Sequence, residues 1–224
     1  MADVALFCQD QGGNAVIPVS LKPEPADFNS LVREPGERFL RRIPAPKGKQ
    51  WKPHAYWTKV LHELHDAYGG ICAYSCHWIP SDTGFSSVEH FQPKDIHPQL
   101  AYEWSNYRLV AGILNGRRGT HQDVLDPFAI QADWFMIEFP SLLVKPAAHL
   151  EHDIKVRVRA TIERLGLNEE QTCRKNRRRY VLRYCQGKLP FEHLEDEAPF
   201  IAYELIRQNL VVNIREIMGV SPAP

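Results

Sequence analysis

A Glu-His pair and two later asparagines are the residues of this sequence best suited to chemistry. Glu89 and His90 are adjacent, and Asn106 and Asn115 follow within the next 25 residues. Imidazole titrates near neutral pH, so His90 can take a proton from water as a general base. Carboxylate and amide oxygens are the hard ligands that Mg²⁺ prefers, so Glu89 and Asn115 can share one divalent cation. An activated water and a cation are two requirements of phosphodiester hydrolysis.

The elements around these residues have to bring them together. Residues 85–91 have the composition of a strand, and residues 110–115 are expected to form a short helix. At the end of a strand, the acid can bind the cation while the histidine activates the water. An asparagine on a following helix can then bind the same cation. A lone Glu-His pair is more often an ordinary surface pair, so the ordered set is what indicates catalysis.

This ordered set resembles the HNH endonuclease family, in the variant whose last motif residue is asparagine. The resemblance implies a core of two strands and a helix around one Mg²⁺ or Mn²⁺ ion. It implies that Glu89 and Asn115 are metal ligands and that His90 is the general base. It also implies that Asn106 braces the connecting loop and orients His90.

Four further segments are similar to one subgroup of that family: residues 70–74, 89–94, 125–127 and 160–168. The subgroup includes standalone bacterial nucleases and the nuclease subunits of Septu-type and retron-linked anti-phage systems, which work beside an ATPase. The resemblance covers residues 55–185. It implies an anti-phage effector that cuts DNA, with RNA as the alternative substrate and an ATPase subunit as partner.

The cysteines depart from the family pattern. Many relatives hold a structural zinc with two cysteine pairs, but here Cys72 and Cys76 are spaced C-x₃-C, and Ala111 and Leu114 stand where the second pair would fall. A tetrahedral site needs four ligands, so we do not expect a structural zinc. His77 and His121 are speculative substitutes for the missing ligands.

Basic residues are grouped although the formal net charge is zero. A nuclease of zero net charge needs a local positive face to hold phosphates. The alternatives are ordinary solvated side chains, or a basic surface facing an acidic partner or the chain's own acidic tail. The expected nucleic-acid contacts are Lys94, Arg117, Arg118, Arg177 and Arg178.

Two other functions are compatible with the sequence. The chain could be a partner or binding subunit of an ATPase complex that keeps the HNH scaffold and has little activity alone, because apolar residues within 200–218 could form a docking surface. It could also be a zinc-stabilised interaction module, which the loss of zinc ligands disfavours.

The expected fold is α+β, with the HNH core embedded in a mainly helical protein. Residues 1–53 are expected to be an irregular, basic arm, residues 54–140 the nuclease core with a preceding helix, and residues 141–224 a helical region. Residues 71–79 and 85–91 are expected to pair as a hairpin, and residues 134–139 to form a strand. Apolar spacing predicts helices over 54–68, 154–165, 169–184 and 200–218.

Bulk composition is that of a globular protein. The chain has 224 residues, of which 44% are hydrophobic, and no apolar run approaches the roughly 18 residues of a membrane helix. An odd, scattered set of five cysteines argues against a secreted disulfide framework. We therefore expect a cytoplasmic protein that does not enter membranes.

Overall fold

The computed structural model describes residues 19–221, and it is an α+β protein in which helices predominate. Within that range the strands form two separate, two-stranded antiparallel sheets. β1 (Ser86–His90) pairs with β2 (Tyr107–Ala111), and β3 (Phe135–Glu138) pairs with β4 (Leu143–Pro146). The expected fold class is confirmed, and so is a strand near residues 134–139.

The hairpin that carries the Glu-His pair has a different partner from the one expected. β1 pairs with β2, and Glu89 lies opposite Arg108. The segment 71–79 instead closes on itself through an isolated bridge between Ile71 and Trp78. The predicted pairing of 71–79 with 85–91 was therefore wrong, because a short apolar run does not reveal which strand it will pair with.

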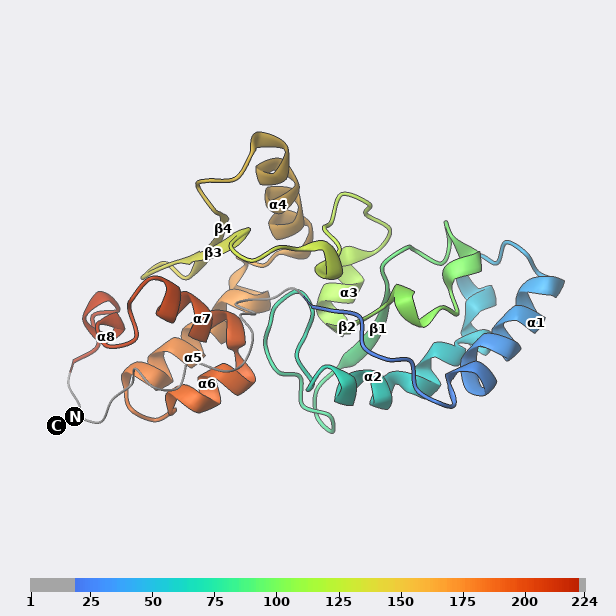
Figure 1. Cartoon of the computed structure of the whole chain (residues 1–224), viewed down its shortest axis with the longest axis horizontal. Coiled ribbons are helices and arrows are strands. Elements are labelled where there is room, and N and C mark those ends of the chain that lie inside the picture. The colour runs from blue at the N-terminus through green and yellow to red at the C-terminus, as the bar shows by residue number, and fades with distance from the viewer. Residues whose placement is uncertain (1–18, 222–224) are drawn as a thin grey trace.

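Helix α3 (Gly112–Arg118) follows β2 without a connecting loop (Figure 1). The start of the expected helix at residue 110 was wrong by two residues, because Val110 and Ala111 still belong to β2. Two antiparallel strands and a helix are thus consecutive along the hairpin. Asn115 lies on the helix and Glu89 on the strand packed beside it.

The N-terminal part is helical rather than irregular. After a π-helical turn at Asn29–Arg33 come α1 (Glu34–Arg42), two 3₁₀ segments at Gly48–His54 and Tyr56–Val60, and α2 (Leu61–Ala67). Phe28 is fully buried, and its ring packs edge-on against Trp104 and Tyr107, with centroids 5.6 and 5.8 Å apart. The expectation of a free arm was therefore wrong for the described part of 1–53, and residues 1–18 lie outside the described residues.

The C-terminal part is a layer of helices, most of which lie at one end of the molecule (Figure 1). It contains α4 (His152–Leu165), a π-helical turn at Glu170–Arg174, α5 (Lys175–Cys185), α6 (Phe191–Glu197), α7 (Pro199–Arg207) and α8 (Ile214–Ile217). The single helix expected over 200–218 is two helices. The break falls at Asn209, whose φ of +55° is left-handed and ends α7.

Asn168 directly precedes the helix expected over 169–184, but its side chain does not cap a helix. Its side chain bonds both backbone groups of Val144: it accepts from the amide at 2.7 Å and donates to the carbonyl at 2.8 Å. It therefore ties the segment between α4 and the π-helical turn to strand β4. The first residues of the expected helix over 169–184 form the π-helical turn instead.

The two halves share one apolar core. Buried side chains from α1 to α8 form a single contiguous cluster. Backbone contacts cross between the halves as well: the Trp78 amide donates to the Glu197 carbonyl at 2.8 Å, and the Leu125 amide donates to the Thr161 hydroxyl at 2.9 Å. The expected boundary near residue 141 does not separate independently packed bodies.

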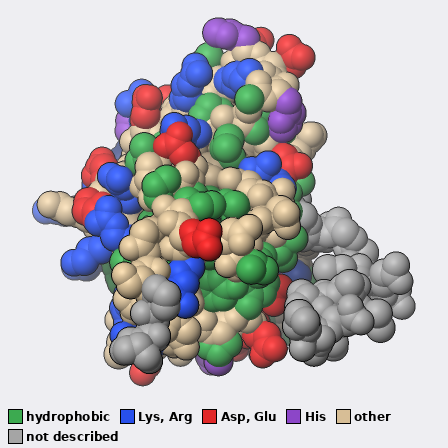
Figure 2. Space-filling view, turned by 90° about the vertical axis from the view of Figure 1, so that its left-hand side faces the viewer, with side chains coloured by type: hydrophobic (Ala, Val, Ile, Leu, Met, Phe, Trp, Pro, Cys, Tyr) green, Lys and Arg blue, Asp and Glu red, His purple; other side chains and the backbone are tan. Residues whose placement is uncertain are grey.

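The apolar residues within 200–218, which could have formed a docking surface, are divided between the core and the surface. Phe200, Ile201, Leu205 and Ile214 are buried in the core. Other apolar side chains of this end are exposed: Ile206, Val212 and Ile217. Figure 2, which views the end that carries α8, shows hydrophobic side chains gathered in the middle of this face. Among the helices of residues 19–221, none has the length and apolar character to span a bilayer.

Candidate active site

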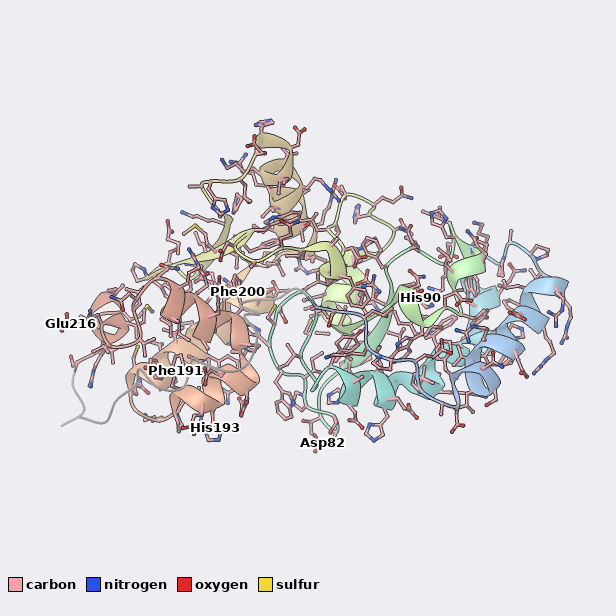
Figure 3. The ribbon with its side chains drawn as sticks, in the orientation of Figure 1. Asp82, His90, Phe191, His193, Phe200 and Glu216 are labelled. Carbon is pink, nitrogen blue, oxygen red and sulfur yellow. The ribbon has the colours of Figure 1, made fainter. Side chains whose placement is uncertain are left out.

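A pocket of about 490 Å³ lies where β1, α3 and the loop after β1 meet. Its wall includes Glu89, His90 and Asn115, so the structure brings together three of the residues singled out from the sequence. Figure 3 places His90 on the α1 side of the molecule, away from the C-terminal helices marked by Phe191 and Glu216. Trp57, Leu61 and Phe85 supply apolar lining, and Lys94 and Thr120 add polar groups.

The His90 imidazole is held in one tautomer. Its Nε2 lies 2.9 Å from the Ala101 carbonyl oxygen, which can only accept, so Nε2 carries the proton and Nδ1 keeps a lone pair. Burial, helped by the charge of Lys94, lowers the pKa of His90 to about 3. The ring is therefore neutral at pH 7, which is the form that accepts a proton. The Trp57 ring meets it edge-on, with centroids 4.7 Å apart.

Asn106 closes the loop between β1 and β2. Its Oδ1 accepts from the Gln92 amide at 2.7 Å, and its Nδ2 donates to the carbonyls of Gln92 and Leu100, each at 3.0 Å. Leu100 precedes Ala101, whose carbonyl holds His90. Asn106 therefore fixes the position of the group that orients the imidazole.

Tyr107 contributes to the same arrangement and was missed in the sequence. Its hydroxyl donates to the Ala101 carbonyl at 2.9 Å, so that oxygen accepts from both Tyr107 and His90. Tyr107 lies directly opposite His90 in the β1–β2 register. Its position next to Asn106 was visible in the sequence, but its role depends on a strand pairing that was not predicted.

Glu89 is a buried carboxylate that faces the buried guanidinium of Arg118. Its side chain is 2% exposed, and Arg118 Nε lies 3.1 Å from Oε1. Even so, both Glu89 oxygens lack a hydrogen-bond partner among the described residues, as do Arg118 Nε and the Tyr74 hydroxyl. Burial raises the pKa of Glu89 to about 7 although Arg118 opposes the shift. A buried, unsatisfied carboxylate of this kind suits a bound cation.

Asn115 offers the second ligand. Its Nδ2 donates to the Ser87 hydroxyl at 3.0 Å and to the Val88 carbonyl at 3.2 Å. These bonds tie the amide to β1 beside Glu89 and use only its nitrogen, so within the described residues Oδ1 has no hydrogen-bond partner. The Glu89 carboxylate and Asn115 Oδ1 suit a divalent cation whose remaining ligands are water and substrate oxygens. No three His, Cys, Asp or Glu side chains of residues 19–221 are grouped to hold a metal.

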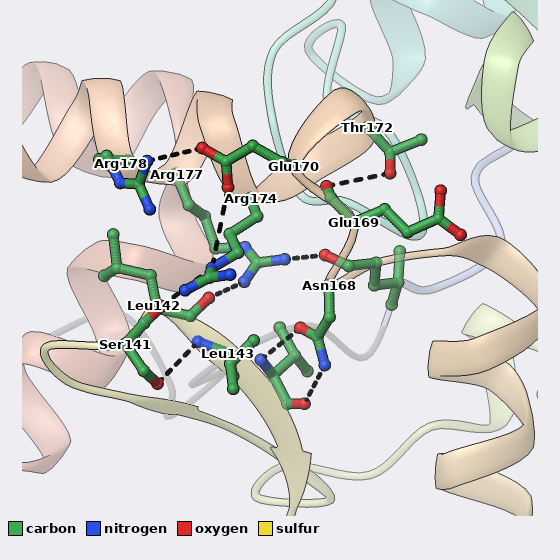
Figure 4. A network of polar contacts seen from close by, with 12 residues as sticks. Ser141, Leu142, Leu143, Asn168, Glu169, Glu170, Thr172, Arg174, Arg177 and Arg178 are labelled. Atoms are coloured by element: carbon green, nitrogen blue, oxygen red, sulfur yellow. Dashed lines mark hydrogen bonds and ion pairs between the residues drawn. The ribbon is translucent and has the colours of Figure 1, made fainter.

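Two of the five basic residues expected to contact nucleic acid are buried, which corrects the prediction for both. Arg118 is 1% exposed, faces Glu89 and donates to the Phe91 carbonyl at 2.8 Å. Arg177 is 2% exposed and donates to the carbonyls of Leu142 and Leu167 (Figure 4). Both guanidinium groups satisfy internal carbonyls and are not available to a phosphate.

The other three basic residues are at the surface. Arg117 forms a two-pronged ion pair with Glu169 at 2.8 and 2.5 Å, and Arg178 pairs with Glu170 at 2.6 Å (Figure 4 shows the second pair). Lys94 lies on the pocket wall with its ammonium 5.6 Å from the Trp57 ring centroid. Of the described Lys and Arg side chains, Lys94 is the one that lines the pocket.

The cysteines expected to be left over from a zinc site are buried together. Cys72 and Cys76 lie near Cys173, a residue with no assigned role in the sequence, and the neighbouring thiols together with burial raise the pKa of Cys76. The Cys72 sulfur accepts from the Ala111 amide at 3.4 Å. His77 is also buried, and Asn176 approaches its Nδ1 at 3.4 Å.

Buried His77 should make folding sensitive to acid. Burial and the charge of Arg177 lower its pKa from 6.5 to about 3, so its contribution to stability is present above pH 6.5 and is lost as pH falls toward 3. We expect His77→Gln to reduce the loss of unfolding free energy between pH 7.5 and 5 by about 2 kcal/mol, at roughly 1.4 kcal/mol per pH unit. Urea unfolding at several pH values measures this. His62→Gln, at an exposed histidine, should leave the slope unchanged, and equal slopes for parent and His77→Gln would refute the expectation.

An antiparallel hairpin followed by a helix, with a carboxylate, a neutral imidazole and an amide oxygen in one pocket, is an arrangement that can bind a divalent cation and activate water. No family model matches the chain. The chain is similar to the Septu protein PtuB of Bacillus thuringiensis, with 26% identity over 118 residues. That alignment covers 52% of this chain and 44% of the PtuB protein, so the chain spans less than half the length of the relative it matches.

Proposed function

We propose that this protein is a divalent-cation-dependent nuclease of the HNH type that hydrolyses phosphodiester bonds, with DNA as the favoured substrate. One observation carries the proposal: Glu89, His90 and Asn115 line a single pocket, and the buried Glu89 carboxylate has no hydrogen bond among the described residues. The order of these residues along the chain and the resemblance to HNH nucleases support the same conclusion.

The roles of the side chains follow from their geometry. His90 Nδ1 accepts a proton from the attacking water, while Nε2–H stays bonded to the Ala101 carbonyl. Glu89 and Asn115 Oδ1 would hold one Mg²⁺ or Mn²⁺ ion, which neutralises charge on the scissile phosphate and on the leaving oxygen. Lys94 is placed to contact a phosphate at the pocket wall.

The proposed setting is anti-phage defence. The similarity to a Septu protein supports it, together with the subgroup motifs in the sequence. In that setting we propose that the nuclease works beside an ATPase subunit. The exposed side chains of Ile206, Val212 and Ile217 favour a protein partner at the C-terminal face. Co-purification of an ATPase from the native host would test this part independently of cleavage.

The central experiment compares the parent with His90→Ala on plasmid DNA, single-stranded DNA and RNA. Each substrate is incubated with Mg²⁺, with Mn²⁺ and with EDTA. Cleavage that requires the metal and is lost in the variant supports the proposal. If both proteins leave all three substrates intact, alone and with the co-purified partner, the proposed function is wrong.

Asn106→Ala should separate positioning of His90 from binding of substrate. The substitution removes three hydrogen bonds from the loop that carries the Ala101 carbonyl. We expect kcat to fall about 10- to 100-fold, as for other groups that orient a catalytic ligand, with KM little changed. Steady-state cleavage measures both constants.

The control for Asn106→Ala is Ser105→Ala, at an exposed neighbour in the same turn. It should leave kcat unchanged. Thermal unfolding of both variants shows whether the lost bonds reduce the folded fraction at the assay temperature. An Asn106→Ala protein that is fully folded and has the parental kcat would remove Asn106 from the site.

A further inference from the structure

Phe85 is an exposed aromatic side chain at the edge of the candidate active site. It is 76% exposed and lines the pocket that holds Glu89, His90 and Asn115. It also lines a neighbouring hollow, together with the part-exposed side chains of Trp78 and Ile113. Phe85 does not belong to the hydrophobic core, so packing does not explain a large apolar side chain exposed beside the proposed catalytic groups.

The Phe85 ring is held in place on one side. A Cβ built on Gly112 would lie 2.0 Å from Phe85 Cδ1, so the ring lies directly over the glycine backbone. The Gly112 amide also donates to the Phe85 carbonyl at 2.7 Å, which continues the β1–β2 ladder by one pair. The rest of the ring is exposed to solvent.

The position of Phe85 relative to the proposed metal ligands follows from the strand. Side chains alternate along β1, so Phe85, Ser87 and Glu89 lie on one face, and four residues span about 13 Å. That distance is within the span of a dinucleotide. A nucleotide next to a phosphate at Glu89 can therefore bring its base to the Phe85 ring.

Electrostatic attraction alone is a weak source of affinity at this pocket. Proteins that hold a duplex mainly through its backbone use many phosphate contacts. Of the basic side chains singled out near the pocket, Arg117 is paired with Glu169 and Arg118 is buried against Glu89, which leaves Lys94. Stacking on an aromatic ring supplies affinity that does not depend on charge.

We propose that Phe85 is a stacking platform for an unpaired base, and that the strand cut at this site is single-stranded. The inference rests on the proposed nuclease function and names its substrate class. Bases inside a duplex are stacked on both faces and offer no face to a side chain, whereas unpaired bases do. DNA and RNA share this chemistry.

The test measures binding in a His90→Ala background, so that bound strands stay intact. Fluorescence anisotropy in Mg²⁺ gives Kd for single-stranded DNA, the matched duplex and single-stranded RNA of the same sequence. Phe85→Ala should weaken single-strand binding about 5- to 150-fold, the effect of one stacked base, and leave duplex binding unchanged. Phe85→Tyr keeps the aromatic ring and should therefore bind the single strand as tightly as the His90→Ala background.

Two further variants sharpen the test. Gly112→Ala places a methyl group where the Phe85 ring lies and should displace it, reproducing the loss without removing the aromatic side chain. Val156→Ala truncates another exposed apolar residue, in helix α4, and should leave binding unchanged. If one of the two single strands, DNA or RNA, binds more tightly and does so through Phe85, that strand identifies the preferred sugar of the substrate.

The outcomes separate this inference from the proposed function. A parent that cuts nucleic acid, combined with a Phe85→Ala variant that binds single strands as tightly as its background, would overturn the stacking role and leave the nuclease intact. Equal losses on single strand and duplex would also overturn it. A parent that neither binds nor cuts any of the three substrates would overturn the proposed function itself.

Discussion

His90→Ala is expected to reduce the cleavage rate about 10²- to 10⁴-fold, the usual contribution of a general base, while the chain stays folded. The fold should survive because the Ala101 carbonyl keeps the hydrogen bond from the Tyr107 hydroxyl when His90 Nε2 is lost. Single-turnover cleavage with enzyme in excess measures the chemical step. Circular dichroism and thermal unfolding report the fold.

The matched control for His90→Ala is His62→Ala, which removes a histidine whose side chain is 79% exposed and does not line the pocket. It should cut at the parental rate. Both proteins need the same purification, so that a contaminating nuclease would appear equally in each. A His90→Ala protein that cuts as fast as His62→Ala would mean that another group activates the water.

Glu89→Gln should abolish the response to divalent cations and make the metal-free protein less stable than the parent. The substitution leaves the buried Arg118 guanidinium without its counter-charge, and removing one partner of a buried ion pair costs about 3–5 kcal/mol. In the parent, a cation at 100 times its Kd should stabilise the fold by about 2.7 kcal/mol. The variant should show no such gain and a cleavage rate at least about 100-fold lower.

Thermal unfolding with increasing Mn²⁺, and calorimetric titration of the same ion, measure this directly. Glu192→Gln changes an exposed carboxylate in the C-terminal layer and should keep the metal response. A purely structural role for Glu89, as the partner of Arg118, predicts the same loss of stability without metal but no change in the response to Mn²⁺. Mn²⁺ binding by Glu89→Gln with parental affinity would remove Glu89 from the metal site.

The grouping of Glu89, His90 and Asn115 in one pocket could be predicted from the sequence because the information is local. Glu89 and His90 are adjacent, and Asn115 lies on the helix that follows β2 directly. The pairing of the strands was not local: 16 residues separate His90 from Tyr107, and the apolar run at 71–79 was an equally plausible partner. Because the pairing of β1 with β2 was not predicted, the role of Tyr107 opposite His90 was not predicted either.

The buried arginines show a different limit. Charged side chains are rarely fully buried, so Arg118 and Arg177 were assigned to the surface. Arg177 is buried because carbonyls of Leu142 and Leu167, from separate segments, meet at its guanidinium. Arg118 is buried because it faces Glu89. Neither arrangement has a signature in spacing or composition, since each depends on contacts between segments that are distant in the chain.

The apolar core shared by the two halves has a practical consequence for dissecting this protein. Cutting the chain after β4 would break two hydrogen bonds. The Leu125 amide would lose its acceptor, the Thr161 hydroxyl, and the Trp78 amide would lose the Glu197 carbonyl. It would also uncover apolar surface against which the β1–β2–α3 unit is packed. A stable fragment that keeps the candidate site is therefore not obtained by trimming, and any evolutionary replacement of the C-terminal helices has to preserve the surface on which the hairpin rests.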